Sequence, residues 1–191
     1  MGLSNGAVRA FGGAGGNSDG YGAAPVKPFE AVFIQFLEGE ERPGDAHIAM
    51  ADTGGAQVAR LGRRVRVLIA DTHPVIRRAV RSTLLVHPEI EVCGEATTGV
   101  EAIEEAKKLK PDVVVMNITL PVLNGFETAR EIKAVLPEAA IVILSQHADR
   151  EFVEEARKIG IRAYVAKTRA AEALVKAVQA AAIGEDFVLI E

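Results

Sequence analysis

Residues 112–136 read DVVVMNITLPVLNGFETAREIKAVL, and they join an apolar strand to a helix through one short loop. The run DVVVMN is almost wholly apolar, which is typical of a strand that is buried on both faces of a sheet. Asn117 ends this run, and Pro121 follows four residues later. The run GFETAREIKAVL then has the length and composition of a helix. The stretch therefore predicts one strand–helix unit with an amide side chain at the carboxyl end of its strand.

The same alternation continues in both directions along the chain. Residues 64–70 (RVRVLIA) predict a strand, and residues 73–86 predict a helix because Ile76, Val80 and Leu84 form an apolar stripe. The other predicted strands are residues 90–96, 139–145 and 161–167, and the other predicted helices are residues 99–110, 149–160 and 168–184. Five strands that alternate with five helices predict an α/β fold, in which helices cover both faces of a five-stranded parallel sheet.

The composition narrows the class of protein. Hydrophobic residues make up 49% of the 191 residues and charged residues 25%, which is typical of a globular chain. The net charge of -4 gives no overall electrostatic basis for binding nucleic acid. Cys93 is the only cysteine, so an internal disulfide framework is excluded. No apolar run approaches the roughly 20 residues that span a bilayer, and we expect a cytoplasmic protein without membrane contact.

The chain divides into four parts. Residues 1–28 are rich in glycine and cannot bury enough apolar surface to offset their conformational entropy, so we expect a disordered tail. Residues 29–64 are an extension or linker of uncertain role: they form a docking element, or translation begins at Met50. The folded domain is expected at residues 65–184, and residues 185–191 are expected to be a C-terminal tail.

Ligands of open parallel sheets bind outside the carboxyl ends of the strands, near the point where the strand order reverses. Six polar or aromatic side chains stand at or near these ends: Asp71, Thr72, Asn117, Ser145, Tyr164 and Lys167. The loop after the first strand, DTHPV, matches neither glycine-rich phosphate-binding pattern, which counts against a nucleotide site. His73 beside Asp71 is not interpreted as a metal ligand.

Four segments together resemble the receiver domains of two-component response regulators, in particular the nitrate-regulator (LuxR-type) subfamily. These segments are VLIADTHPVIRRAVRSTL, PDVVVMNITLPVLNGFETARE, IVILSQHAD and RAYVAK, and they occur in the order and at the spacing of that family. The resemblance covers about residues 65–184. It implies a flavodoxin-like (CheY-like) three-layer sandwich with strand order 2-1-3-4-5.

The resemblance assigns roles only in part. Asp71 matches the first of two acids after strand one, whereas Thr72 stands where the second acid binds Mg²⁺. Asn117 stands where the family has its phosphoacceptor aspartate. The remaining positions match: Ser145 is the switch hydroxyl, Tyr164 the switch aromatic and Lys167 the phosphate-pairing lysine.

The two departures have a common chemical consequence. An acyl phosphate forms on a carboxylate, and an amide cannot replace that nucleophile. Mg²⁺ prefers charged oxygen ligands in octahedral geometry, and only Asp71 would remain charged. We therefore expect neither phosphorylation at Asn117 nor Mg²⁺ binding, and we expect no other cofactor. A network of Asp71, Asn117 and Lys167 is expected to hold the strand ends without metal.

These expectations predict a phosphorylation-independent pseudo-receiver, which is not an enzyme and which binds a histidine kinase, another regulator or a second copy. The resemblance suggests a surface formed by Arg150, Glu151, Glu154, Tyr164 and Leu174. GEDFVLIE resembles the start of the subfamily's linker, no basic recognition helix follows it, and direct DNA binding is not expected. The alternatives are a conventional phosphoacceptor that uses Asp71, and a flavodoxin-like domain that binds a small molecule.

Overall fold

The computed structural model describes residues 62–147 and 149–190. The glycine-rich segment, Met50 and residues 29–61 of the extension lie outside the described residues. The strands are β1 (Val65–Ala70), β2 (Ile90–Ala96), β3 (Val113–Met116), β4 (Ala140–Ser145), β5 (Ala163–Ala166) and β6 (Phe187–Leu189). The helices are α3 (Pro74–Leu85), α4 (Gly99–Leu109), α5 (Gly125–Val135), α6 (Arg150–Ile159), the 3₁₀ turn η1 (Lys167–Arg169) and α7 (Ala170–Ala182).

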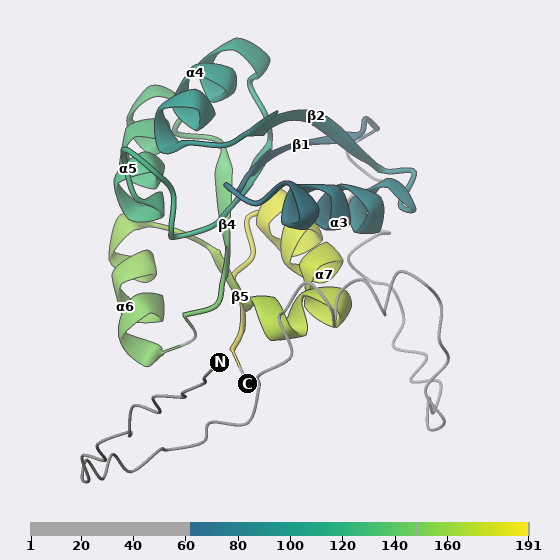
Figure 1. Cartoon of the computed structure of the whole chain (residues 1–191). Coiled ribbons are helices and arrows are strands. Elements are labelled where there is room, and N and C mark those ends of the chain that lie inside the picture. Colours follow the sequence, from purple (N-terminus) through teal and green to yellow (C-terminus); the bar gives the residue numbers. More distant parts are fainter. Residues whose placement is uncertain (1–61, 148, 191) are drawn as a thin grey trace, which may run out of the picture.

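All strands pair in parallel in the order β2-β1-β3-β4-β5-β6. The predicted order of the first five strands is therefore confirmed. Helices α3 and α7 cover one face of the sheet, and α4, α5 and α6 cover the other (Figure 1). The result is the three-layer sandwich that the alternation of strands and helices predicts.

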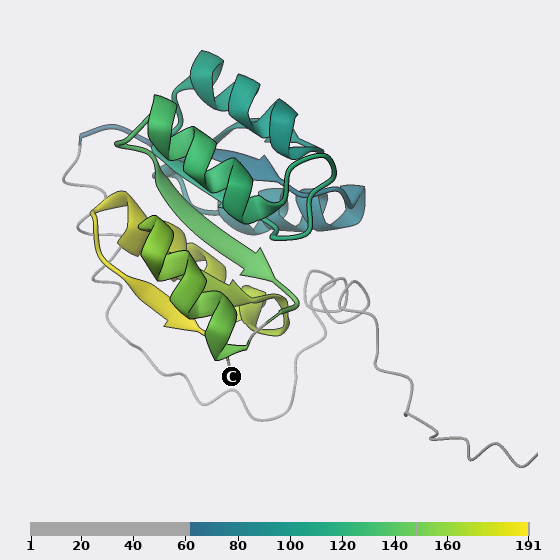
Figure 2. The ribbon, with the colours of Figure 1, turned by 90° about the vertical axis from the view of Figure 1, so that its left-hand side faces the viewer.

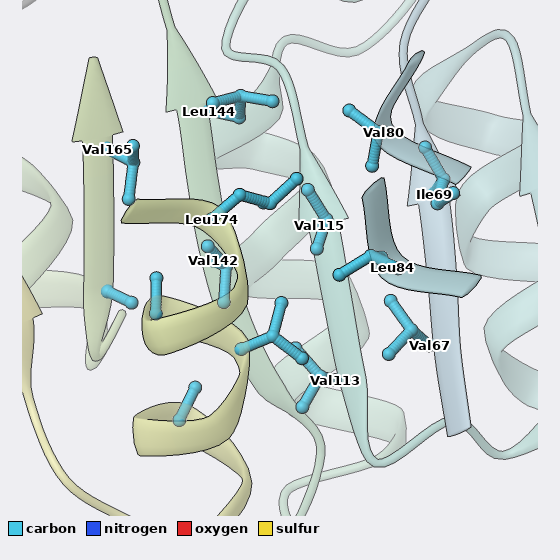
Figure 3. Packing of buried hydrophobic residues seen from close by; sticks show 14 of the residues in the cluster. Val67, Ile69, Val80, Leu84, Val113, Val115, Val142, Leu144, Val165 and Leu174 are labelled. Carbon is cyan, nitrogen blue, oxygen red and sulfur yellow. The ribbon is translucent and has the colours of Figure 1, made fainter. Parts of the chain in front are cut away.

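Two apolar cores lie on the two faces of the sheet, because successive side chains of a strand point in opposite directions. In β1, Val67 and Ile69 pack toward α3 and α7, whereas Leu68 and Ala70 pack toward the other three helices. Leu174 of α7 lies over the central strands on the first face (Figure 3). The strands read as continuous apolar runs because both of their faces are buried.

The beginning of α5 fixes the loop that follows β3. Asn124 accepts hydrogen bonds from the backbone N–H groups of Phe126 and Glu127, and the Glu127 carboxylate accepts one from the backbone of Asn124 in return. The backbone N–H of Gly125 donates to the carbonyl of Ile118 at 2.7 Å. A Cβ atom at Gly125 would lie 2.5 Å from the Asn117 carbonyl oxygen, so this close approach requires glycine.

One boundary prediction is wrong. Residues 185–191 are not simply a tail, because Phe187–Leu189 form β6 and pair in parallel with Ala163–Val165 of β5. Phe187 and Leu189 pack against the core on the α7 side, which supplies the apolar burial that a tail would lack. The domain therefore extends past residue 184, and among the described residues the sheet has six strands. Strand β6 lies at its outer edge (Figure 2).

Within residues 62–147 and 149–190, no helix is both long enough and apolar enough to cross a membrane.

Candidate functional site

The carboxyl ends of β1, β3, β4 and β5 meet at one edge of the sheet. Strand β1 pairs with β2 on one side and with β3 on the other, so the strand order reverses between β1 and β3. Four polar residues at these ends are almost fully buried: Asp71, Asn117, Ser145 and Lys167, with 3%, 5%, 0% and 3% of their surface exposed. All four lie at the carboxyl-end edge of the sheet, and Lys167 reaches Asp71 beside the reversal point.

Asp71 and Lys167 form a buried ion pair. The Lys167 ammonium donates to Oδ2 of Asp71 at 2.7 Å. The other oxygen, Oδ1, accepts the backbone N–H of His73 at 2.9 Å and lies 3.0 Å from His73 Nδ1. Both oxygens of this carboxylate are therefore engaged by protein groups. Removing either partner would destabilise the fold, because the remaining charge would be buried without compensation.

Asn117 does not join that ion pair. Its backbone N–H continues the pairing of β3 with β1 by donating to the Ala70 carbonyl at 2.9 Å, and its side-chain amide donates to the Thr119 carbonyl at 3.3 Å. The predicted three-residue network is therefore wrong for Asn117, because its side chain bonds to neither Asp71 nor Lys167 among the described residues. Lys167 and His73 already engage the carboxylate, and the amide turns to a carbonyl of its own loop.

Thr72 is exposed, and its side chain bonds to the loop after β2. Its hydroxyl donates weakly to the Thr97 carbonyl at 3.4 Å, which links the loop after β1 to the loop after β2. In the part of the chain that the structure describes, no group of three or more His, Cys, Asp or Glu side chains could hold a metal ion. The Asp71 carboxylate is hydrogen-bonded to the Lys167 ammonium.

The loop after β4 is held by Ser145 and Tyr164. Ser145 Oγ accepts the backbone N–H of His147 at 3.1 Å, and the Tyr164 hydroxyl donates to the His147 carbonyl. Tyr164 is buried, and this burial raises the pKa of its phenol to about 12. The Ser145 hydroxyl opposes this rise in pKa, and the charge of Asp149 adds a smaller increase. The His147 ring stacks on Phe152 of α6, with ring centroids 5.1 Å apart. His147 is therefore bonded to residues of β4 and β5 and stacked on α6.

Only some residues of the predicted interaction surface are exposed. Arg150, Glu151 and Glu154 of α6 are exposed, and Arg150 lies 3.4 Å from Glu154 as an ion pair. Tyr164 and Leu174 are 1% and 0% exposed, so their assignment to this surface is wrong. Tyr164 lies under the loop after β4, and Leu174 is on the face of α7 that packs on the sheet (Figure 3).

Arg77 is a residue of the site that the sequence alone did not identify. Its guanidinium donates to the Asp71 carbonyl at 2.8 Å and to the Glu95 carboxylate of β2 at 3.1 Å. It therefore fixes the backbone of the loop that carries Asp71. The only sequence signal is its place in the first turn of α3, next to the apolar stripe that begins at Ile76.

The sequence of this chain is similar to a known family and to known proteins. The family model of the response regulator receiver domain matches residues 67–179. The transcriptional regulatory protein DegU of Brevibacillus brevis is 33% identical over 125 residues, which are 65% of this chain and 53% of DegU. The uncharacterized transcriptional regulatory protein YxjL of Bacillus subtilis is 37% identical over 122 residues, 64% of this chain and 56% of YxjL. The chain thus spans about half the length of these relatives.

A solved structure extends the likeness to the fold. The signal receiver domain of the putative response regulator NarL from Mycobacterium tuberculosis superposes with a TM-score of 0.61 at 30% sequence identity. The match covers 64% of this chain and 99% of that domain.

Proposed function

The chain belongs to the response regulator receiver family of two-component signalling, and from this premise we propose that it is a pseudo-receiver that works without accepting a phosphoryl group. In this proposal it is not an enzyme, and it transmits signals by binding other proteins in one conformation.

The observation that carries the proposal is the amide at the end of β3. Asn117 is buried at the reversal point of the sheet, where the family pattern has a nucleophilic aspartate. Formation of an acyl phosphate requires a negatively charged oxygen that attacks phosphorus. The amide oxygen carries no full charge, and the amide nitrogen has a delocalised lone pair. Asn117 therefore lacks the chemistry of a phosphoacceptor.

The surroundings of Asp71 support the same conclusion. Its carboxylate accepts hydrogen bonds from Lys167 and from the backbone of His73. Attack on a phosphoryl donor would require it to leave the ammonium while buried, at a cost of several kcal/mol. Phosphoryl transfer also depends on a divalent cation that neutralises the developing charge. Because Thr72 and Asn117 are both uncharged, we expect weak Mg²⁺ binding and no productive transfer.

The contacts of His147 support the proposal of a single working conformation. Tyr164 is inside the fold and bonded to the His147 carbonyl, and Ser145 is bonded to the His147 amide. A pseudo-receiver in this state does not need phosphate to select the arrangement, and a partner that binds it would stabilise it further. The exposed residues of α6, Arg150 and Glu151, remain candidate contacts for a histidine kinase or another regulator.

Direct DNA binding is a separate question. The relatives carry the name transcriptional regulatory protein, and this chain spans about half of their length. The net charge of -4 favours a protein partner over nucleic acid for the chain as given. The absence of direct DNA binding therefore stays a prediction. Small-molecule binding gains no support at the strand ends, because the buried side chains there bond to one another or to the backbone.

The test is incubation of the protein with acetyl phosphate and Mg²⁺, followed by measurement of the intact mass. We expect no gain of a phosphoryl group in the wild type. The double variant Thr72→Asp/Asn117→Asp, which restores both acids, is the positive control and is expected to gain one. A stable phosphoryl group on the wild type that disappears in Asp71→Asn would show that Asp71 is a conventional phosphoacceptor, and the proposal would then fail.

A further inference from the structure

The two outer strands of the sheet differ in how they are protected. Strand β2 reads IEVCGEA, carries two glutamates, and has an irregularity in its pairing with β1 between Val67 and Leu68. Charged side chains and bulges are common devices that keep an edge strand from pairing with another chain. Strand β6 and the residue after it read FVLI, without charge or proline, and lie at the opposite edge (Figure 2). The β6 edge therefore lacks both devices.

The backbone of β6 has a defined free side. The N–H of Phe187 donates to the Arg162 carbonyl at 2.9 Å, so the polar groups of Phe187 point toward β5. Because successive residues of a strand direct their N–H and C=O groups to opposite sides, those of Leu189 also point toward β5 and those of Val188 point away from it. Among the described residues, β5 is the only strand that pairs with β6.

The side chains of this segment also alternate. Phe187 and Leu189 pack on the core at the α7 side, and Ile190 packs on the core at the α6 side. Val188 lies between them, and 38% of its surface is exposed. The segment thus combines an outward backbone donor and acceptor at Val188 with apolar side chains on both faces.

We propose that β6 pairs antiparallel with β6 of a second copy of this chain, around a two-fold axis at Val188. In this register Val188 faces its own symmetry mate, and the two residues exchange both N–H···O=C hydrogen bonds. Phe187 then faces Leu189 of the other copy, and both side chains already lie on the α7 face. Asp186 faces Ile190, so the acidic side chain next to β6 faces an apolar one.

A second copy is the occupant that fits this edge best. The antiparallel arrangement is isologous, so it closes as a dimer and leaves neither β6 edge free. A parallel strand added to β6 would leave a new open edge and would require a partner with another sequence. The inference rests on the proposed role as an interaction module, for which it names a partner. It uses no phosphate chemistry, so its test and that of the proposed function can fail separately.

The first test is sedimentation velocity of the full chain over a range of concentrations. We expect a monomer–dimer equilibrium in the wild type, and a dissociation constant raised about tenfold or more in Val188→Pro and Val188→Lys. Proline removes an N–H group that β5 does not use, and it is tolerated at an edge in this orientation. Lysine at the two-fold axis would face another lysine. Val135→Lys, at a similarly exposed valine at the end of α5, is the matched control and should dimerise like the wild type.

The second test locates the contact. Directly opposed residues of a hydrogen-bonded antiparallel pair have Cα atoms about 5.5 Å apart, within the range of a disulfide. In a Cys93→Ser background, Val188→Cys should form a covalent dimer under mild oxidation, and Val135→Cys should not. A wild type that stays monomeric at all concentrations would overturn the proposal. A dimer that persists in Val188→Pro and Val188→Lys, or that leaves Val188→Cys uncrosslinked, would do the same.

Discussion

The two halves of the pocket at the strand ends differ in how completely they are bonded. On the side of β1 and β5, Asp71 and Lys167 are buried ions that bond to each other at 2.7 Å. On the side of β3, the side chain of Asn117 makes one long hydrogen bond to its own loop, at 3.3 Å. The first half is a buried pair of opposite charges, whereas the second half presents an uncharged amide. The difference teaches that the ion pair of Asp71 and Lys167 forms without any bond to the side chain of Asn117.

The largest expected effect follows from removing Lys167 from its buried ion pair with Asp71. Lys167→Met should lower the free energy of unfolding by about 3–5 kcal/mol, because it leaves the Asp71 carboxylate buried without its ammonium. Asn117→Ala should cost about 1 kcal/mol or less, because it removes one long hydrogen bond. Urea unfolding of the two variants measures both values.

A double variant separates lost charge compensation from lost packing. Asp71→Asn/Lys167→Met has no buried ion left, so it should recover most of the stability lost in Lys167→Met alone. If Lys167→Met proved no more harmful than Asn117→Ala, the ion pair would not be the structural half of the pocket.

The next largest expected effect is a loss of stability at high pH, when the Tyr164 phenol ionises. The pKa of Tyr164 is raised by burial to about 12, so the fold favours the neutral phenol. The corresponding stability is present below pH 10 and is lost as the pH rises toward 12, with a total of about 2–3 kcal/mol. Thermal melts between these pH values should show a steeper loss in the wild type than in Tyr164→Phe. Equal slopes for the two proteins would show that the phenol is not buried as described.

A third and smaller effect tests whether acids at the β3 side restore a metal site. Thr72→Asp/Asn117→Asp should be less stable than the wild type without metal, because three carboxylates then share one pocket. Mg²⁺ at ten times its dissociation constant should return about 1.4 kcal/mol to this variant and nothing to the wild type. Melting curves with and without Mg²⁺ measure the difference. If Asn117→Asp alone showed the full response, Thr72 would not matter for the ion.

The first five strands and the residues at their ends followed from the sequence for a physical reason, whereas the order of the strands was implied by the resemblance to receiver domains. Strands buried on both faces need apolar residues at nearly every position, so runs such as RVRVLIA and AAIVILS are hard to mistake. In a parallel sheet all carboxyl ends lie at one edge, which places Asp71, Asn117 and Lys167 together before any side chain is positioned.

What the sequence did not predict depends on packing between distant segments. Strand β6 has three residues, and it is a strand only because the edge of β5 is available to it. The hydrogen bond of Asn117 depends on which groups have already engaged Asp71. The burial of Leu174 was predictable, since Ala173, Leu174, Ala177 and Val178 form a helical stripe that faces a core.

The smallest expected effect tests for backbone strain at Val122, in the loop after β3. Val122 follows Pro121 in the loop after β3, and its φ of 71° lies in the left-handed region, which is costly for a β-branched residue. Its side chain is 80% exposed, so Val122→Gly loses little packing. Relief of about 1–2 kcal/mol of strain, less about 0.5–1 kcal/mol for the entropy of glycine, should raise the free energy of unfolding by about 0.5–1 kcal/mol.

The matched control for Val122→Gly is Val135→Gly, at an exposed valine that ends α5 in helical conformation. Glycine there gains nothing from a positive φ and weakens the helix, so the sign of the change should be opposite. Urea unfolding of both variants measures the two signs together. If both substitutions lowered the free energy of unfolding, Val122 would not be strained by its positive φ. The contrast between the two halves of the pocket would then lie in the bonding of Asp71 and Lys167 alone.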